Sequence, residues 1–183
     1  LLQNLAHKAG RPAQLMAALN RDFCRIVPHD EELIFVTAFY LVLDTMNRTA
    51  SYASAGHAPP LKLSRPRGEV NTLASAECIC PALGLYRTTE YQDYDCQIAP
   101  GDVFLLYTDG VVEAPNPEGE EFGQERLRAA AEESLAQGAA NLSQDLLQEL
   151  HAFMDTVVTP DDICIVTVEV ASGPQPSLPK HPQ

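Results

Sequence analysis

The sequence has few basic residues. Lysine and arginine together number 12, against 25 aspartates and glutamates, and the formal net charge of the 183-residue chain is -13 at pH 7. Nucleic acids and anionic membranes are bound by basic surfaces, so this charge argues against both as partners. An acidic surface is better suited to divalent cations.

Long apolar runs are missing as well. No stretch approaches the roughly 18 consecutive apolar residues that span a membrane, and the first residues do not resemble a signal peptide. The five cysteines are too few for a disulfide framework, and their odd number favours reduced thiols. We therefore expect a soluble, cytoplasmic protein, and the 45% hydrophobic content predicts one domain with a packed core.

The sequence also lacks a recognisable covalent nucleophile. None of the five cysteines lies in a glycine-rich loop that could cradle a phosphate, and no serine-nucleophile motif occurs. Cys78 and Cys80 have no second Cys/His pair at zinc-site spacing, so we interpret them as small buried groups on a strand.

What is present is organised around one apolar run of strand length, residues 103–107. Pro100 and Gly101 form a turn before it, and Asp109 and Gly110 follow it directly. A glycine after an aspartate lets another backbone approach whatever the carboxylate binds. An Asp-Gly pair after a strand is most often only a turn, so its role depends on the rest of the chain.

The periodicity of apolar residues predicts an α+β fold with helices layered on a mainly antiparallel sheet. We expect residues 33–43 to form a central strand buried on both faces, and residues 94–98 and 103–107 to form a hairpin. Ser143 is the expected N-cap of a late helix. The other expected elements are helices at 1–6, after Pro12 and at 124–137, and strands at 49–55, 61–64, 70–73 and 163–170.

Two carboxylates lie at the ends of predicted strands. Asp109 comes just after one strand, and Asp161 comes just before the last one. If these strands are antiparallel neighbours, the two carboxylates converge, and hard oxygen ligands of this kind favour magnesium or manganese. For Asp161 and Asp162 the alternative is a solvated turn before a strand, which stays open at this point.

An ordered series of motifs resembles the SpoIIE-like branch of the metal-dependent 2C-type serine/threonine protein phosphatases. Each motif is weak alone, but the series is specific and spans residues 1–170. The matching segments are 35–44, 52–61, 81–85, 101–114, 122–123 and 161–163.

The resemblance implies a sandwich of two antiparallel sheets flanked by helices, with two manganese or magnesium ions at one end. It implies Asp109 and Asp161 as metal ligands and a metal-bound water as the nucleophile, without a phospho-enzyme. Gly110, His57 and Asp162 are candidate neighbours of the site. For His57 the alternative is a strand-end histidine that orders a turn.

The sequence departs from the family pattern at its start. The family's first acidic motif, an aspartate followed by Ser-Gly-His-Gly, supplies the ligand that bridges both metals, and it is absent here. We therefore expect either an N-terminally truncated phosphatase domain or a degenerate relative. On its own the chain should bind metal weakly, show little activity, and be less stable or self-associate, for example as a homodimer, through an uncovered sheet edge. Residues 171–183 are expected to be a disordered, Pro-rich tail.

The function implied is hydrolysis of phosphoserine or phosphothreonine on a bacterial regulatory protein, such as an anti-sigma-factor antagonist in a stress response. An upstream sensor or receiver domain would control it. Two alternatives remain open: a non-catalytic scaffold that binds a partner, and an acidic module that binds divalent ions without phosphoryl chemistry.

Overall fold

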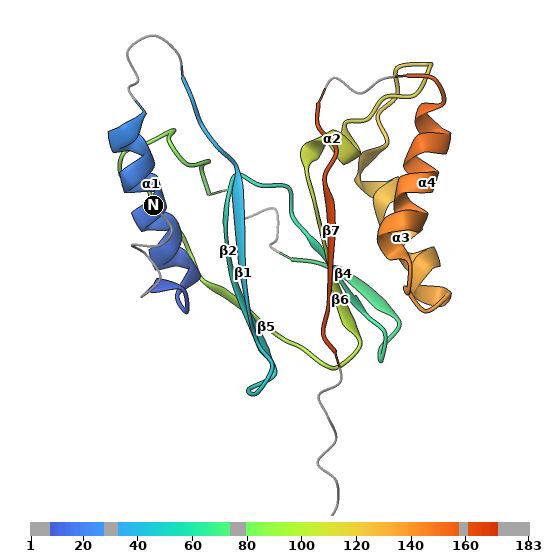
Figure 1. The fold of residues 1–183 in the computed structure, drawn as a ribbon, viewed down its shortest axis with the longest axis horizontal. Helices are drawn as coiled ribbons and strands as arrows, with labels where there is room; N and C mark the ends of the chain where they lie inside the picture. Colours follow the sequence, from blue (N-terminus) through green and yellow to red (C-terminus); the bar gives the residue numbers. More distant parts are fainter. Residues whose placement is uncertain (1–7, 28–32, 74–79, 158–160, 172–183) are drawn as a thin grey trace, which may run out of the picture.

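The computed structural model describes residues 8–27, 33–73, 80–157 and 161–171, which form four layers (Figure 1). Helix α1 (Pro12–Ile26) covers one sheet, a second sheet stacks on the first, and helices α3 (Gly123–Ala136) and α4 (Leu142–Met154) cover the outer face of the second. The first sheet has the order β1 (Ala38–Asp44), β2 (Thr49–Ala55), β5 (Tyr94–Gln97). The second has the order β4 (Glu69–Thr72), β3 (Leu61–Ser64), β6 (Asp102–Tyr107), β7 (Ile165–Glu169). All pairs of neighbouring strands are antiparallel, so the predicted α+β sandwich is confirmed.

Strand β6 is buried on both faces because it lies between two apolar cores. Phe104 belongs to the core between the two sheets, whereas Val103 and Leu105 point into the core under α3 and α4. Successive side chains of a strand point to opposite faces, so a continuous apolar run is what a strand in this position needs. The sequence interpretation of residues 103–107 is confirmed.

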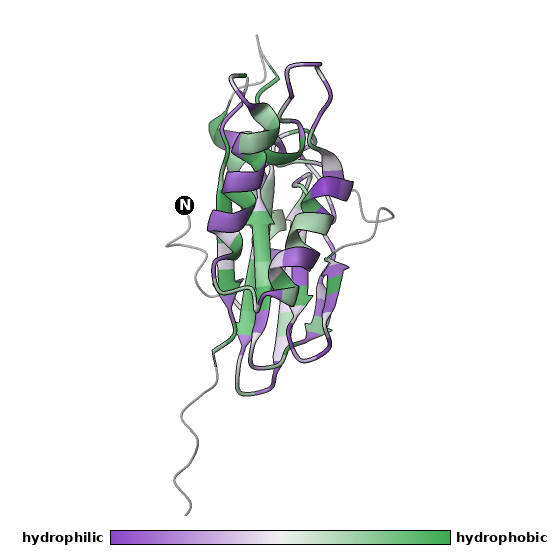
Figure 2. Cartoon of the chain, turned by 90° about the vertical axis from the view of Figure 1, so that its right-hand side faces the viewer, coloured by the Kyte–Doolittle hydropathy of each residue, from purple (hydrophilic) through white to green (hydrophobic). Residues whose placement is uncertain are grey.

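Helices α1, α3 and α4 each present one apolar side to a sheet. In α1, Pro12 occupies the first turn, where its missing N–H costs nothing, and Met16 packs against Ala53 and Ala55 of β2. Seen from the α3–α4 side, purple and green alternate along these helices, and the strands behind them are largely green (Figure 2). This alternation is the pattern of helices that cover a sheet with one face and meet water with the other.

The prediction of a central strand over residues 33–43 is wrong. Strand β1 begins only at Ala38, and every residue in it is half-buried, since it pairs with β2 on one side and is the edge of the described sheet on the other. Leu33 and Phe35 precede the strand and are 63% and 52% exposed. Composition alone identified strand formers here, but burial on both faces needs neighbours that the described residues do not provide.

The predicted hairpin between residues 94–98 and 103–107 is also wrong. Strand β5 pairs with β2 in the first sheet, and β6 pairs with β3 and β7 in the second. The turn at Pro100 and Gly101 therefore carries the chain from one sheet to the other. A short turn between two apolar runs fits a hairpin and a sandwich corner equally well, and only packing distinguishes them.

The remaining predictions concern a helix cap, the two ends of the chain, the cysteines and membrane spans. The late helix begins at Leu142 with Asn141 as its N-cap residue, so Ser143 lies inside the helix and the predicted cap is wrong. The expected helix at 1–6 and the tail after residue 171 lie outside the described residues, as does Cys78. The cysteines within the described ranges are all free, and none of the helices there is long and apolar enough to cross a membrane.

A buried ion pair closes the end of the second sheet where β6 begins. Lys62 Nζ lies 3.0 Å from Asp102 Oδ2, and the two side chains are only 15% and 2% exposed. The same carboxylate oxygen accepts a hydrogen bond of 2.9 Å from the N–H of Ala99 in the turn that changes sheets. Asp102 thus joins β3, β6 and the corner between the two sheets.

We predict that Asp102→Ala lowers the free energy of unfolding by about 3 kcal/mol, because it leaves Lys62 as an unpaired, largely buried cation. Asp22→Ala is the matched control, since Asp22 pairs with Arg25 at 3.4 Å on the surface, where such pairs contribute about 1 kcal/mol or less. Urea denaturation of both variants measures the difference. Equal losses would mean that burial does not decide the contribution of the Lys62–Asp102 pair.

Candidate metal centre

Asp109 lies at the end of the molecule opposite the Lys62–Asp102 pair. Strand β6 ends at Tyr107, and Asp109 is the first residue of α2 (Asp109–Val112), the short helix at the upper end of β6 in Figure 1. Its carbonyl oxygen accepts a hydrogen bond of 2.9 Å from the N–H of Glu113, which closes the single turn. The side chain of Asp109 is exposed, so its carboxylate is open to solvent ligands.

Asp161 comes to the same end of the second sheet. Strands β6 and β7 are antiparallel neighbours in which Tyr107 pairs with Ile165, so the end of β6 lies beside the start of β7. The antiparallel pairing of these two strands, which the sequence analysis set as a condition, is confirmed. The convergence of the two carboxylates stays a prediction. Asp161 is exposed, and its Oδ1 accepts a hydrogen bond of 2.7 Å from the N–H of Asp162.

Gly110 is the point of closest approach between the two segments. A Cβ built on Gly110 would lie 2.7 Å from the carbonyl oxygen of Asp162 and 3.5 Å from that of Asp161. Only a residue without a side chain fits there, since contacts under 3.0 Å force a neighbour to move. The glycine that follows Asp109 therefore admits the backbone of the second aspartate segment.

Thr108 attaches the same segment through hydrogen bonds. Its N–H donates to the carbonyl oxygen of Cys164 at 3.1 Å, and its hydroxyl donates to the carbonyl oxygen of Asp162 at 2.9 Å. The hydroxyl also accepts a hydrogen bond of 2.9 Å from the N–H of Cys164. The sequence analysis did not single out Thr108; the available signal was a hydroxyl residue placed between a buried strand and a candidate ligand.

His57 lies where the chain crosses from β2 to β3, and it is half-buried. Burial lowers the pKa of His57, and the negative charge of Asp109 acts in the opposite direction. Its Nδ1 lies 3.4 Å from Thr37 Oγ1, and its ring centre lies 6.4 Å from that of Phe39. His57 thus lies within electrostatic range of Asp109 and contacts Thr37 and Phe39, so both interpretations of this residue stay open.

Tyr107 anchors the crossing segment that carries His57. Its buried hydroxyl lies 2.9 Å from the carbonyl oxygen of Pro59 and 3.0 Å from Gln124 Oε1 at the start of α3. Burial raises the pKa of Tyr107, so the hydroxyl stays protonated and able to donate. The last residue of β6, Tyr107, and the residue after it, Thr108, therefore connect the elements around Asp109.

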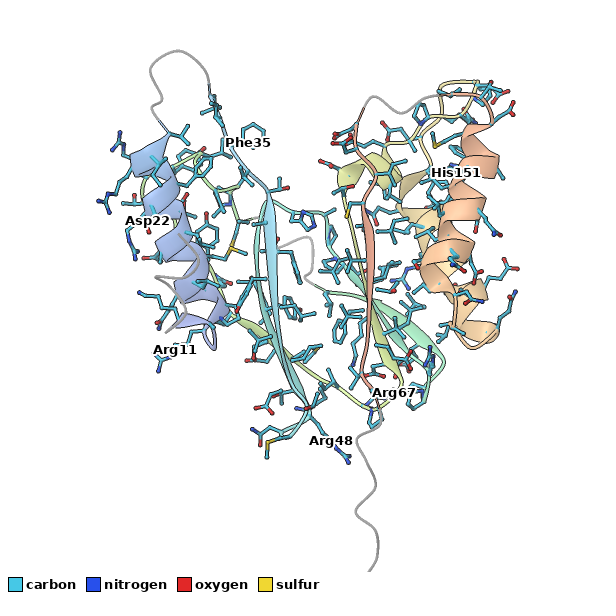
Figure 3. All side chains as sticks on the ribbon, in the orientation of Figure 1. Arg11, Asp22, Phe35, Arg48, Arg67 and His151 are labelled. Atoms are coloured by element: carbon cyan, nitrogen blue, oxygen red, sulfur yellow. The ribbon has the colours of Figure 1, made fainter. Side chains whose placement is uncertain are left out.

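The same end of the molecule also carries exposed apolar side chains. Phe35 lies at this end of the first sheet, whereas Arg48 and Arg67, in the hairpin turns, lie at the other end (Figure 3). Leu33, Ile34, Phe35 and Val36 are all between 44% and 63% exposed.

The donors at this end fit a hard divalent cation in type. Asp109 and Asp161 supply carboxylate oxygens, and magnesium is commonly held by one or two carboxylates together with water and substrate phosphate. Asp162, next in the chain after Asp161, is exposed as well. Within residues 8–27, 33–73, 80–157 and 161–171, no group of three or more His, Cys, Asp or Glu side chains is arranged to hold a metal ion.

The four-layer architecture is that of the 2C-type protein phosphatases. The structure superimposes on the SiaA-PP2C domain of Pseudomonas aeruginosa with a TM-score of 0.73 at 21% identity, covering 86% of this chain and 60% of that one. It superimposes on the phosphatase domain of SpoIIE from Bacillus subtilis with a TM-score of 0.57 at 13% identity, covering 88% and 67%. At these identities the likeness shows the fold alone.

The sequence comparisons identify the family. The family model of stage II sporulation protein E (SpoIIE) matches residues 1–171, and the chain belongs to this SpoIIE-like branch. It is 26% identical to the phosphoserine phosphatase RsbU of Bacillus subtilis over 165 residues, 90% of this chain and 47% of RsbU. It is 31% identical to protein IcfG of Synechocystis over 140 residues, 76% of this chain and 21% of IcfG. The chain thus spans less than half the length of either relative.

We predict that Gly110→Ala costs about 1 to 3 kcal/mol of stability, because the added methyl group must displace the backbone of Asp162. Helix propensity alone would favour alanine in α2, so a loss reports the steric contact. Gly10→Ala is the matched control, since a Cβ at Gly10 meets nothing within 4 Å. Thermal and urea unfolding measure both variants; a Gly110→Ala protein as stable as the control would contradict the close approach.

Proposed function

We propose that this chain is a phosphatase domain that hydrolyses phosphoserine or phosphothreonine esters with two manganese or magnesium ions. The observation that carries the proposal is the close approach of Gly110, the residue after Asp109, to the backbone of Asp161 and Asp162, in a chain of the SpoIIE family. The antiparallel pairing of β6 with β7 and the exposure of Asp109 and Asp161 support this proposal, because carboxylate oxygens are the ligands that hard cations prefer.

In this proposal Asp109 and Asp161 hold the metal ions, which supply Lewis acidity toward water and neutralise charge on the phosphoryl group. Gly110 keeps the two aspartate segments in contact. Asp162 and His57 are neighbours of the site, and burial favours the uncharged form of His57. No covalent intermediate on the protein is part of the proposal.

The proposed substrate is a phosphorylated bacterial regulatory protein of the anti-sigma-factor antagonist type. Similarity to the phosphoserine phosphatases RsbU and RsbP of Bacillus subtilis supports phosphoserine as the group that is hydrolysed. We further propose that the domain acts in the cytoplasm as the output of a signalling protein, under an upstream sensor or receiver domain, in stress-response regulation. The net charge of -13 argues against nucleic acid as the partner.

A second candidate function is a non-catalytic scaffold that keeps the fold and binds a partner. The exposed apolar side chains of residues 33–36 favour this candidate, because an exposed apolar patch marks a surface that contacts a partner. The two functions differ in one measurable property, turnover of a phosphoprotein in the presence of metal.

We predict that hydrolysis of a phosphoserine peptide by the whole protein requires added manganese or magnesium. A chelator should abolish activity, and restoring the metal should recover it, because no covalent nucleophile is available to act without the metal. Phosphate release measures the rate. Activity that survives thorough chelation would contradict the metal mechanism, and no activity under any metal would favour the scaffold.

We predict that Asp109→Asn lowers the rate at least about a hundredfold, about 3 kcal/mol of transition-state stabilisation, because an amide is a poorer ligand than a carboxylate. Its melting temperature should stay close to that of the wild type, since the side chain is exposed. Asp22→Asn, on α1 and away from α2, is the control and should retain full activity. An Asp109→Asn protein that unfolds would instead assign Asp109 a structural role.

A further inference from the structure

The segment that carries Asp161 lies outside the regular ladder of the sheet. The pairing of β6 with β7 ends at Tyr107 and Ile165, so Asp161 to Cys164 come before the first paired residue of β7. Three hydrogen bonds continue the attachment of this segment to β6, and Thr108 takes part in each of them. Two of the three use its side chain rather than its backbone.

A hydroxyl is suited to this position because it both donates and accepts. The Thr108 hydroxyl donates to the carbonyl oxygen of Asp162 and accepts from the N–H of Cys164, so one side chain satisfies two backbone groups two residues apart. Valine has nearly the same shape, but its side chain can neither donate nor accept a hydrogen bond. Serine keeps the hydroxyl, which can both donate and accept, and lacks only the methyl group of threonine.

Thr108 is also the residue directly before Asp109. The backbone of Thr108 determines where Asp109 begins α2, and its side chain determines where the backbone of Asp162 lies. On the other side of Asp109, Gly110 contacts the same carbonyl oxygen of Asp162. Asp109 is therefore flanked on both sides by contacts to the segment that carries Asp161.

We propose that Thr108 is a positioning residue that sets the placement of Asp161 relative to Asp109. The inference rests on the proposed metal-binding function of these two carboxylates. Without the hydroxyl, the Asp161 segment would sample more conformations, and a cation would have to order it on binding. The affinity for the cation would then fall by the cost of that ordering.

The same argument predicts little effect on folding. Thr108 is half-buried, and each net hydrogen bond contributes on the order of 1 kcal/mol, so the core around β6 remains intact without it. A purely structural role would lower the melting temperature and leave the metal affinity of the folded protein unchanged. The two roles can therefore be separated.

The test compares three variants of the whole protein: Thr108→Val, Thr108→Ser and Thr167→Val. Thr167 is an exposed threonine of β7 paired with Leu105, and it serves as the matched control. Calorimetric titration with manganese alone measures affinity, and amide hydrogen exchange measures opening of the segment. We expect Thr108→Val to raise the Kd for manganese at least about tenfold. Thr108→Ser should stay within about threefold of the wild type, and Thr167→Val should not differ from it.

Hydrogen exchange gives a readout that needs no metal. In Thr108→Val the amide of Cys164 should exchange faster, because its acceptor is gone, while the amides paired between β6 and β7 keep their protection. Faster exchange together with unchanged manganese affinity would overturn the proposal. Equal weakening by valine and serine would also overturn it, as would a Thr108→Val protein that is unfolded at 25 °C.

These outcomes are distinct from failure of the proposed function. A wild-type protein that binds manganese, loses affinity in Thr108→Val and hydrolyses no phosphopeptide would support the positioning role and contradict the phosphatase activity. An active wild-type protein whose manganese affinity does not depend on Thr108 would contradict the positioning role alone. A wild-type protein that binds no manganese would contradict both.

Discussion

The antiparallel pairing of β6 with β7 is the constraint on which the rest of this structure depends. Strand β6 contributes buried side chains to both cores, and β7 comes to it from a distant part of the chain. Its apolar side chains stabilise the sandwich, and its pairing brings residues 108–110 beside residues 161–164. The same interaction thus supports the fold and assembles the candidate site.

The two ends of β6 have different roles because their side chains differ. At the start of the strand, Asp102 is buried, paired with Lys62 and bonded to the sheet-changing turn, so this end closes the sandwich. At the other end, the buried hydroxyl of Tyr107 contacts the crossing segment from β2 to β3, and Asp109 remains exposed. Burial and an ion pair hold Asp102 at one end, whereas Asp109 at the other end stays in contact with solvent.

The residues beside Asp109 show how a short loop can hold a carboxylate without burying it. Gly110 permits backbone contact, and Thr108 supplies the hydrogen bonds that continue the ladder past its last pair. Neither residue withdraws the carboxylate of Asp109 from solvent. The two segments are thus held together by a backbone contact and by one hydroxyl group, while Asp109 stays exposed.

The sequence by itself determined the secondary-structure elements whose patterns are local. The buried run at residues 103–107, the helix after Pro12 and the strands β3 and β4 followed from period, propensity and turn residues. It also identified Asp109, Gly110 and Asp161 as residues of one candidate site, through strand ends and a family resemblance. Tertiary structure alone decided that β1 is half-buried, that the turn at Pro100 changes sheets, and that the Thr108 hydroxyl reaches the segment of Asp161. These features depend on which strands become neighbours, and contacts between residues far apart in the sequence leave no local pattern in the chain.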